Sequence, residues 1–240
     1  MKKGLLVAAV VVAILAGLAF FAYNRLDLVV KVVLEHYGPD VTGVSVKVGE
    51  VEISPHDGRG KLRNLEIGNP AGFSASRAAR FGNVVLEMDP ATLRAPVVHV
   101  RAIGIEAPTI VYERGDKTTN LDVISRNIEA YAKRSIDEEV ASDGPMRTKR
   151  RFIIDRLLIR GAKVTMTMPS LRGQGVTFDL PDIELRDIGA RQNGVTASQA
   201  ASIVANAIVA RIAQRVLSNI DLLRKGGVEG AIDALKGLVR

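Results

Sequence analysis

The chain has 240 residues, of which 47% are hydrophobic and 25% are charged, and its formal net charge is +7. This composition is that of a folded protein with a sizeable core and excludes wholesale disorder. Cysteine is absent, which excludes disulfides, thiolate metal sites and cysteine nucleophiles, and the three histidines lie too far apart for a histidine-rich metal site.

An uncharged run occupies Gly4–Tyr23, near the N-terminus. As a helix with a rise of about 1.5 Å per residue, this run is roughly 30 Å long, which matches the hydrocarbon core of a bilayer. Lys2 and Lys3 precede the run. Because positive charge stays on the cytoplasmic side, we expect a transmembrane helix with the N-terminus inside and the bulk of the chain outside.

A cleaved signal peptide is the alternative interpretation of the same run, with Gly17-Leu18-Ala19 as the cleavage site. The run is longer than the apolar region of about 7–15 residues that signal peptides usually have. Apolar residues at helical spacing also continue past the run as far as Tyr37, and Gly38-Pro39 is predicted to end this helix. Both features favour an uncleaved anchor.

From Val44 onward the apolar residues alternate as in strands, but each alternating unit contains one extra residue in its middle. The extra residue is typical of a bulge or bend, because without it the second half of the strand would present its apolar residues on the wrong face. The clear copies of the unit are Val46, Val48, Val51, Ile53; Val98, Val100, Ile103, Ile105; Phe152, Ile154, Leu157, Ile159; and Phe178, Leu180, Ile183, Leu185.

The longest match between copies has an offset of 54 residues and aligns Val98–Tyr112 with Phe152–Met166. Each copy predicts a strand, a short turn at Ala107-Pro108 or Gly161-Ala162, and a second strand. Repeated bent strands with one apolar face predict an antiparallel sheet that curls. Its concave face must be covered by helices, by a second sheet or by acyl chains.

The apolar residues of the repeated unit do not decide between these three covers, because they are mostly aliphatic. Aliphatic walls are sufficient for lipid tails, whose transfer from water gains about 0.8 kcal/mol per buried CH₂. The residues of the four copies are therefore our candidate lipid-facing residues.

Polar and helical segments follow the strands. Thr119–Arg134 has an apolar stripe with Thr119 as N-cap. Thr196-Ala-Ser-Gln199 fits a capping box that opens a helix to Asn219, and Val228–Arg240 is a last amphipathic helix that could pack against the sheet or lie on an anionic membrane surface. The predicted organisation is a transmembrane helix and its extension at 1–38, a first sheet half with its helix at 39–134, a polar linker at 135–150, a second sheet half at 151–195, and amphipathic helices at 196–240.

Catalytic patterns are weak throughout the sequence. Gly58-Arg-Gly-Lys61 lacks the spacing and the Ser/Thr of a phosphate loop, and no GxSxG occurs. We therefore expect no enzyme, no catalytic residues, no cofactor and no metal. The basic charge comes without a basic helix that carries interleaved aromatics, so we expect no nucleic-acid partner.

Several motifs follow one another in an order that is moderately specific. They are the N-terminal anchor, Leu62–Ile67 with Gly68-Asn-Pro-Ala-Gly-Phe73, Val97–Glu113 with its Ala-Pro, Thr119-Asn120-Leu121, Phe152–Leu158, and Ile183–Gly189. This order resembles that of the bacterial AsmA-like proteins, in a short form, over about residues 1–195.

The resemblance implies an α+β protein of the bacterial inner membrane, with a single span at residues 4–23, a cytoplasmic N-terminus and a periplasmic body. That body is implied to be a groove-like, curled antiparallel β-sheet with flanking amphipathic helices, similar to the chorein-like part of bridge-type lipid transfer proteins. Larger members of the family are implicated in moving phospholipid between the two membranes of diderm bacteria. The sheet of this chain is too short to span a periplasm alone.

Two functional hypotheses follow. In the first, the protein is non-enzymatic, binds phospholipid acyl chains in the groove and contributes to envelope lipid transport or homeostasis. In the second, it is a scaffold or accessory subunit of an envelope complex, with the sheet filled by its own helices at 119–134 and 196–219. The expected partners are membrane phospholipids and either envelope proteins or a second copy of the chain.

Overall fold

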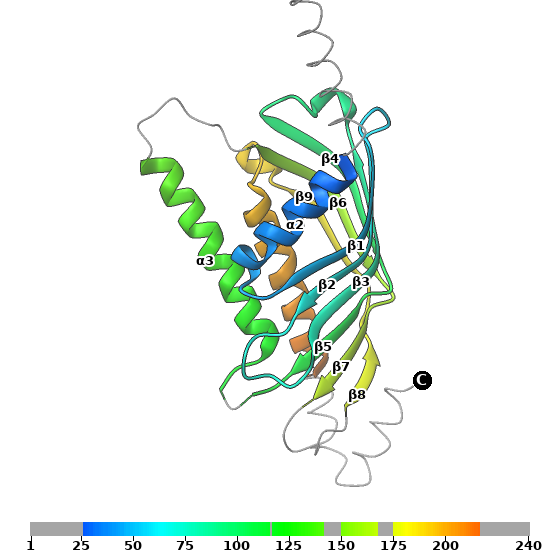
Figure 1. The fold of residues 1–240 in the computed structure, drawn as a ribbon, viewed down its shortest axis with the longest axis vertical. Coiled ribbons are helices and arrows are strands. Elements are labelled where there is room, and N and C mark those ends of the chain that lie inside the picture. The colour runs from blue at the N-terminus through cyan, green and yellow to red at the C-terminus, as the bar shows by residue number, and fades with distance from the viewer. Residues whose placement is uncertain (1–25, 116, 142–149, 168–174, 217–240) are drawn as a thin grey trace, which may run out of the picture.

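The computed structural model describes residues 26–115, 117–141, 150–167 and 175–216. They form one curled nine-stranded sheet with helices on its concave side (Figure 1). The helices are α2 (Leu26–Thr42), α3 (Asn120–Ala141) and a helix at residues 197–216, called here the 197–216 helix. The strands are β1 (Val46–Ser54), β2 (Arg59–Gly68), β3 (Arg77–Met88), β4 (Val97–Glu106), β5 (Thr109–Glu113), β6 (Arg151–Arg160), β7 (Lys163–Thr167), β8 (Val176–Asp179) and β9 (Ile183–Ile188).

The nine strands behave as six longer ones. β4 and β5 both pair with β3, so the predicted turn at Ala107-Pro108 is a kink that does not reverse the chain. β6 and β7 likewise continue one another through Gly161-Ala162, and β8 and β9 continue one another through Pro181. Ala107 and Gly161 have φ angles of 46° and 61°, so the left-handed backbone conformation marks both kinks.

The 54-residue repeat is a repeat of neighbouring parallel strands. Val98 lies opposite Phe152 and Ile105 opposite Ile159, while Tyr112 lies opposite Met166, so the two copies pair in the register of the sequence alignment. The prediction of an antiparallel sheet is therefore wrong, and the sheet is mixed. The physical reason is α3, which lies between the two copies in the chain: parallel neighbours need a long crossover connection, usually a helix.

The inserted residue of the strand unit bends the sheet in two ways. In β4, the register against β3 shifts by one residue between Glu87 and Met88, as a bulge requires. In β1, the register against β2 is continuous on both sides of Gly49. The irregular residue opposite Gly49 is Asn64 of β2, which has a φ of 54°. A Cβ atom on Gly49 would lie 3.0 Å from the carbonyl oxygen of Arg63, so the two strands approach closely at this bend.

α2 covers the free edge of β1. Asp27 accepts a hydrogen bond from the backbone N–H of Ile53 at 2.7 Å, and Glu35 accepts one from the N–H of Val48 at 2.9 Å. Lys31 donates to the carbonyl oxygen of Gly49 at 3.0 Å. These side chains take the place of a neighbouring strand, which is one way in which proteins protect a sheet edge from pairing with another chain.

The predicted end of the first helix at Gly38-Pro39 is wrong, since α2 continues to Thr42. Gly38 serves a close approach instead: a Cβ atom there would lie 2.7 Å from the side chain of Val46 in β1. The exposed face of α2 carries five large hydrophobic side chains beside His36 and Asp40, namely Leu28, Val29, Val32, Val33 and Tyr37.

The helices that the structure describes contradict the prediction of a single-pass membrane protein. In the part of the chain that the structure describes, no helix has the length and apolar character needed to cross a bilayer. The predicted span at residues 4–23 lies outside the described residues. The helical spacing that continues to Tyr37 favoured an anchor, but it belongs to α2, whose polar residues bind β1. The transmembrane helix, the signal anchor and the inner-membrane location with a periplasmic body are therefore unsupported.

The concave face of the sheet is covered by α3 and the 197–216 helix (Figure 1). The predicted caps of both helices are confirmed: Thr119 and Asp122 bond to each other's backbone N–H, and so do Thr196 and Gln199. α3 runs to Ala141, so the first residues of the predicted 135–150 linker are helical, and 142–149 lie outside the described residues. The predicted helix at 228–240 lies outside them as well.

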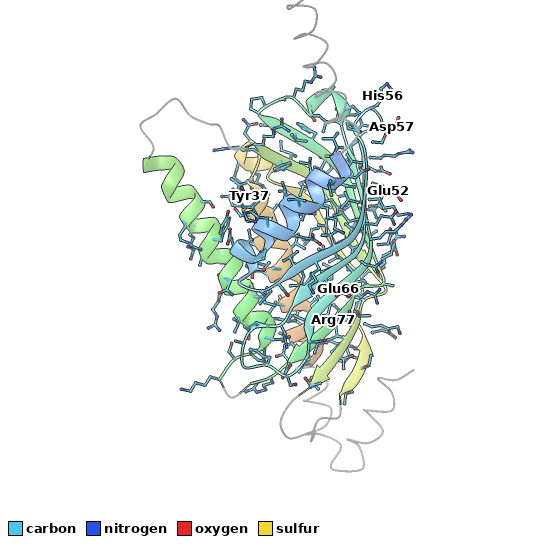
Figure 2. The ribbon with its side chains drawn as sticks, viewed as in Figure 1. Tyr37, Glu52, His56, Asp57, Glu66 and Arg77 are labelled. Carbon is cyan, nitrogen blue, oxygen red and sulfur yellow. The ribbon has the colours of Figure 1, made fainter. Side chains whose placement is uncertain are left out.

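The convex face of the sheet is charged, as the alternation predicts. Figure 2 shows Glu52 on this outer side. Arg63 bridges Glu50 at 2.6 Å and Glu52 at 3.0 Å, and Arg77 bridges Glu66 at 2.5 Å. Exposed pairs of this kind add little stability. They identify the outer face as solvated and leave the concave face for packing or binding.

Candidate functional site

An apolar cavity of about 370 Å³, partly open to solvent, lies between the concave face of the sheet and the two helices that cover it. Apart from the Thr42 and Ser125 side chains, its walls are hydrophobic. The sheet contributes Ile67, Ala78, Ala79, Phe81, Ile103, Ile110, Ile154 and Leu157; α3 contributes Leu121, Ile124, Ser125 and Ile128; and the 197–216 helix contributes Ala200, Ala201, Val204, Ala205, Ile208 and Val209.

Short side chains leave this space open. Ala78 and Ala79 face the cavity from β3, and Ala200, Ala201 and Ala205 face it from the 197–216 helix. Protein interiors are normally packed with few voids larger than a water molecule. A cavity of this size is therefore a departure from ordinary core packing, and alanines on both walls are its direct cause.

Three of the predicted lipid-facing residues, Ile103, Ile154 and Leu157, line the cavity. Most of the others are buried in the protein core instead. Those in the core around the cavity are Val100, Ile105, Phe152, Ile159, Phe178, Leu180, Ile183 and Leu185, whereas Val46, Val48, Val51 and Val98 are buried outside that cluster, and Ile53 is partly buried. Most of the candidate lipid-facing residues are thus packed against protein, and few of them are free to contact a ligand.

The sequence interpretation missed the helical wall of the cavity. Leu121, Ile124 and Ile128 lie on the apolar stripe of α3, and Val204 and Ile208 lie on the stripe of the 197–216 helix. The signal for these residues was present, because both stripes have helical spacing. The stripes alone, however, indicate packing against a sheet and carry no sign of a gap.

Hydrogen bonds hold the two covering helices together. The hydroxyl of Ser125 in α3 bonds to the amide oxygen of Asn206. The amide nitrogen of Asn206 donates to Glu129 at 2.6 Å, one turn farther along α3. Asn127 donates to the carbonyl oxygen of Thr42 at 3.0 Å, which fixes α3 to α2. The cover of the cavity is therefore held together by polar contacts as well as by apolar packing.

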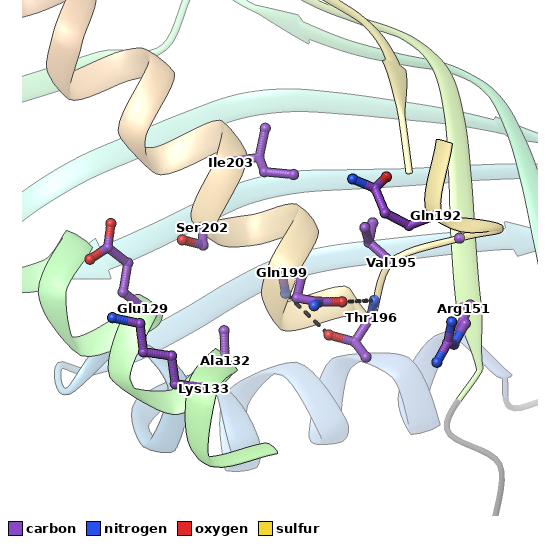
Figure 3. Close-up of a pocket in the computed structure, with 11 residues that line it drawn as sticks. Glu129, Ala132, Lys133, Arg151, Gln192, Val195, Thr196, Gln199, Ser202 and Ile203 are labelled. Carbon is purple, nitrogen blue, oxygen red and sulfur yellow. Dashed lines mark hydrogen bonds between the residues drawn. The ribbon is translucent and has the colours of Figure 1, made fainter. Parts of the chain in front are cut away.

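A second pocket, of about 570 Å³, lies at the N-terminal end of the 197–216 helix (Figure 3). Most of the residues that line it have polar side chains, including two cations, Lys133 and Arg151, and one acid, Glu129. Gln192, Thr196, Gln199 and Ser202 add amide and hydroxyl groups, and Ala132, Gly194, Val195 and Ile203 complete the lining. We call this the polar pocket.

A buried polar network closes the opposite end of the sheet. The carboxylate of Glu113, at the end of β5, accepts hydrogen bonds from the backbone N–H groups of Ser74 at 2.6 Å and Ala75 at 3.1 Å. Asn120 is fully buried, accepts from the N–H of Glu113 at 2.9 Å and donates to Asn69 at 2.8 Å. The network ties the loop after β2 to the start of α3.

Burial by itself raises the pKa of Glu113, but the hydrogen bonds from Ser74, Ala75 and Asn69 outweigh it and hold the pKa of this carboxyl below its ordinary value. Asn69 and Asn120 belong to two of the motifs singled out in the sequence. In this structure both asparagines have a structural role.

The described residues contain no group of three or more His, Asp or Glu side chains that could hold a metal ion. Comparison with models of known protein families gives no match, and comparison with curated proteins gives none either.

Proposed function

We propose that the protein binds the aliphatic chain of a lipid in the apolar cavity under α3 and the 197–216 helix. The structural observation that carries this proposal is the cavity itself, which apart from Thr42 and Ser125 is lined by hydrophobic residues and has a volume of about 370 Å³. Ligand pockets in proteins have roughly 300–1,000 Å³, so the volume is at the lower end of the range for a small ligand. A role in lipid transport or homeostasis would follow from such binding.

The size of the cavity limits the ligand. At roughly 30 Å³ for each water-sized group, the volume holds about a dozen such groups, which suits one chain better than the two chains of a phospholipid. Because the cavity is partly open, the remaining carbons of a longer chain would leave through its open side. Closed apolar cavities of roughly 150 Å³ are known to take up apolar molecules. The resemblance to AsmA-like proteins supports the same proposal, because larger members of that family are implicated in moving phospholipid.

Lipid extraction of the purified full chain tests the proposal. We expect mass spectrometry to find lipid bound to the folded protein, and we expect the delipidated protein to take up hexadecanol. Ala201→Phe should reduce this uptake because the ring fills the cavity, whereas Ala210→Phe, at an exposed position of the same helix, should leave it unchanged. A folded, delipidated chain that takes up no hexadecanol would contradict the proposal.

A scaffold function is the second candidate, and the observation that favours it is the extent of the helical cover. α3 and the 197–216 helix bury most of the concave face, as a sheet filled by its own helices requires. Crosslinking in cells should then yield one discrete complex with another protein. The same complex from a variant such as Ala201→Phe, in which the cavity is filled, would favour the scaffold over the lipid carrier.

A further inference from the structure

The polar pocket has an excess of positive charge. Lys133 and Arg151 are its cations, and in the described residues no ion pair holds either of them. Glu129 is its one acid, and a carboxylate oxygen of Glu129 accepts the hydrogen bond from Asn206. The two cations come from α3 and from the start of β6, and Figure 3 shows them on opposite sides of the pocket, with Gln199 and Thr196 between them.

Neutral hydrogen-bonding groups complete the pocket. Thr196 and Gln199 form the capping box of the 197–216 helix, in which the side-chain oxygen of Gln199 accepts from the backbone N–H of Thr196 at 2.8 Å. This bond leaves the amide NH₂ of Gln199 as a donor. Together with the Ser202 hydroxyl and the Gln192 amide, it offers hydrogen bonds to an oxyanion between the two cations.

The polar pocket follows the apolar cavity along the same elements. On α3, Ile128 lines the cavity and Lys133 lines the pocket, which is a rise of about 7.5 Å at about 1.5 Å per residue. On β6, Ile154 lines the cavity and Arg151 lines the pocket, which is about 10 Å at about 3.3 Å per residue. Along these two elements, the lining of the apolar site and the lining of the cationic site are therefore separated by only about 7.5–10 Å.

We propose that the polar pocket binds the anionic headgroup of the lipid whose chain occupies the cavity. The inference rests on the proposed function and adds a substrate class to it: amphiphiles with a carboxylate or a phosphate at the end of the chain. Lys133 and Arg151 supply positive charge from the two sides of the pocket, while the cavity supplies chain affinity regardless of the headgroup. A neutral amphiphile of equal length gains only the second of these contributions.

Displacement of a neutral fluorescent dye from the delipidated full chain tests the headgroup site with three probes of equal length: hexadecanol, hexadecanoate and hexadecyl phosphate. We expect the two anionic probes to bind more tightly than the alcohol. In the double variant Lys133→Gln and Arg151→Gln, we expect the anionic probes to bind about tenfold more weakly, as for the loss of two exposed charged contacts. Binding of the alcohol should change by less than about twofold.

The matched control is the double variant Lys47→Gln and Arg94→Gln, which removes the same charge from exposed positions that do not line the pocket. It should leave all three affinities unchanged. The difference between hexadecanoate and hexadecyl phosphate shows whether a fatty acid or a phosphate lipid is the better ligand.

The outcomes separate the two proposals. If all three probes bind equally, or if the pocket variant weakens the alcohol as much as the anions, the headgroup site is wrong and chain binding stands. If no probe displaces the dye, chain binding is wrong and the headgroup site falls with it. If inorganic phosphate alone binds and depends on Lys133 and Arg151 while no amphiphile binds, the pocket is a site for a small anion and both proposals fail.

Discussion

Filling the cavity with protein should stabilise the chain. Ala205 lies on the 197–216 helix and faces the cavity, and Ala205→Leu adds three carbon atoms to that space. At about 0.8 kcal/mol per buried CH₂, the gain has an upper limit of about 2.4 kcal/mol. Leucine is nearly as good a helix former as alanine, so the helix itself loses little. We expect the free energy of unfolding to rise by about 1–2 kcal/mol, the remainder being lost to side-chain entropy and imperfect fit.

Chemical denaturation of the delipidated protein measures this change, and the slope of the transition should stay constant. The control is Ala162→Leu, since Ala162 is buried in the same core but does not line the cavity. Overpacking at such a site costs about 1–3 kcal/mol. The two substitutions should therefore have opposite signs. Destabilisation by Ala205→Leu comparable to that by Ala162→Leu would refute the cavity and the lipid proposal based on it.

Three further changes probe the elements around the site. Glu113→Gln should cost about 1.5–3 kcal/mol at neutral pH, as for lost hydrogen bonds to a charged group. The folded pKa of Glu113 lies below its ordinary value of 4.5, so its contribution to the free energy of unfolding is complete above pH 4.5 and is lost as the pH falls through the folded pKa. The denaturation curves of the two proteins should therefore converge in acid. Asp27→Ala should speed hydrogen exchange at the Ile53 amide and lower the free energy of unfolding by about 1 kcal/mol. The control Val32→Lys, on the exposed face of α2, should change the free energy of unfolding by less than about 0.5 kcal/mol. Asn206→Ala removes the hydrogen bonds to Ser125 and Glu129. In stopped-flow measurements, hexadecanol should enter and leave faster by similar factors, so that its affinity is unchanged. Unchanged entry and exit rates would show that these bonds do not hold the cover closed.

The strands were predictable because their pattern is local. Alternation with one inserted residue identifies the faces of β1, β4, β6 and β8–β9 without knowledge of any partner. Strand pairing depends on the connections between strands. The 54-residue repeat and the helix between its copies together indicate parallel neighbours, since Val98 and Phe152 begin strands that run in the same direction and are separated by a crossover. The expectation of an antiparallel sheet used the repeat and left out the connection.

The cavity could not be predicted in the same way. It depends on Ala78 and Ala79 of β3 lying across from Ala200, Ala201 and Ala205 of a helix more than a hundred residues later in the chain. In the sequence, each alanine indicates only a helix former or a small core residue. The cavity arises because the alanines of the strand and of the helix lie across from one another. The polar pocket is non-local for the same reason, because Lys133 and Arg151 lie on opposite sides of the segment predicted as a linker.

The edges of the sheet bear on the choice between a lipid carrier and a scaffold. A scaffold that binds partners by strand addition needs a free edge, but β1 is covered by the side chains of α2. The opposite edge consists of the short strands β8 and β9, interrupted by Pro181, and Asp187 of β9 has a φ of 56°. Glu184 on β9 is held by Arg156 at 2.8 Å and by Arg186 at 2.6 Å. Short strands, proline, irregular backbone and charge all discourage pairing with another chain. Both edges of the described sheet are thus protected from pairing with another strand. This favours a self-contained unit built around its own cavity over a module that extends by adding strands.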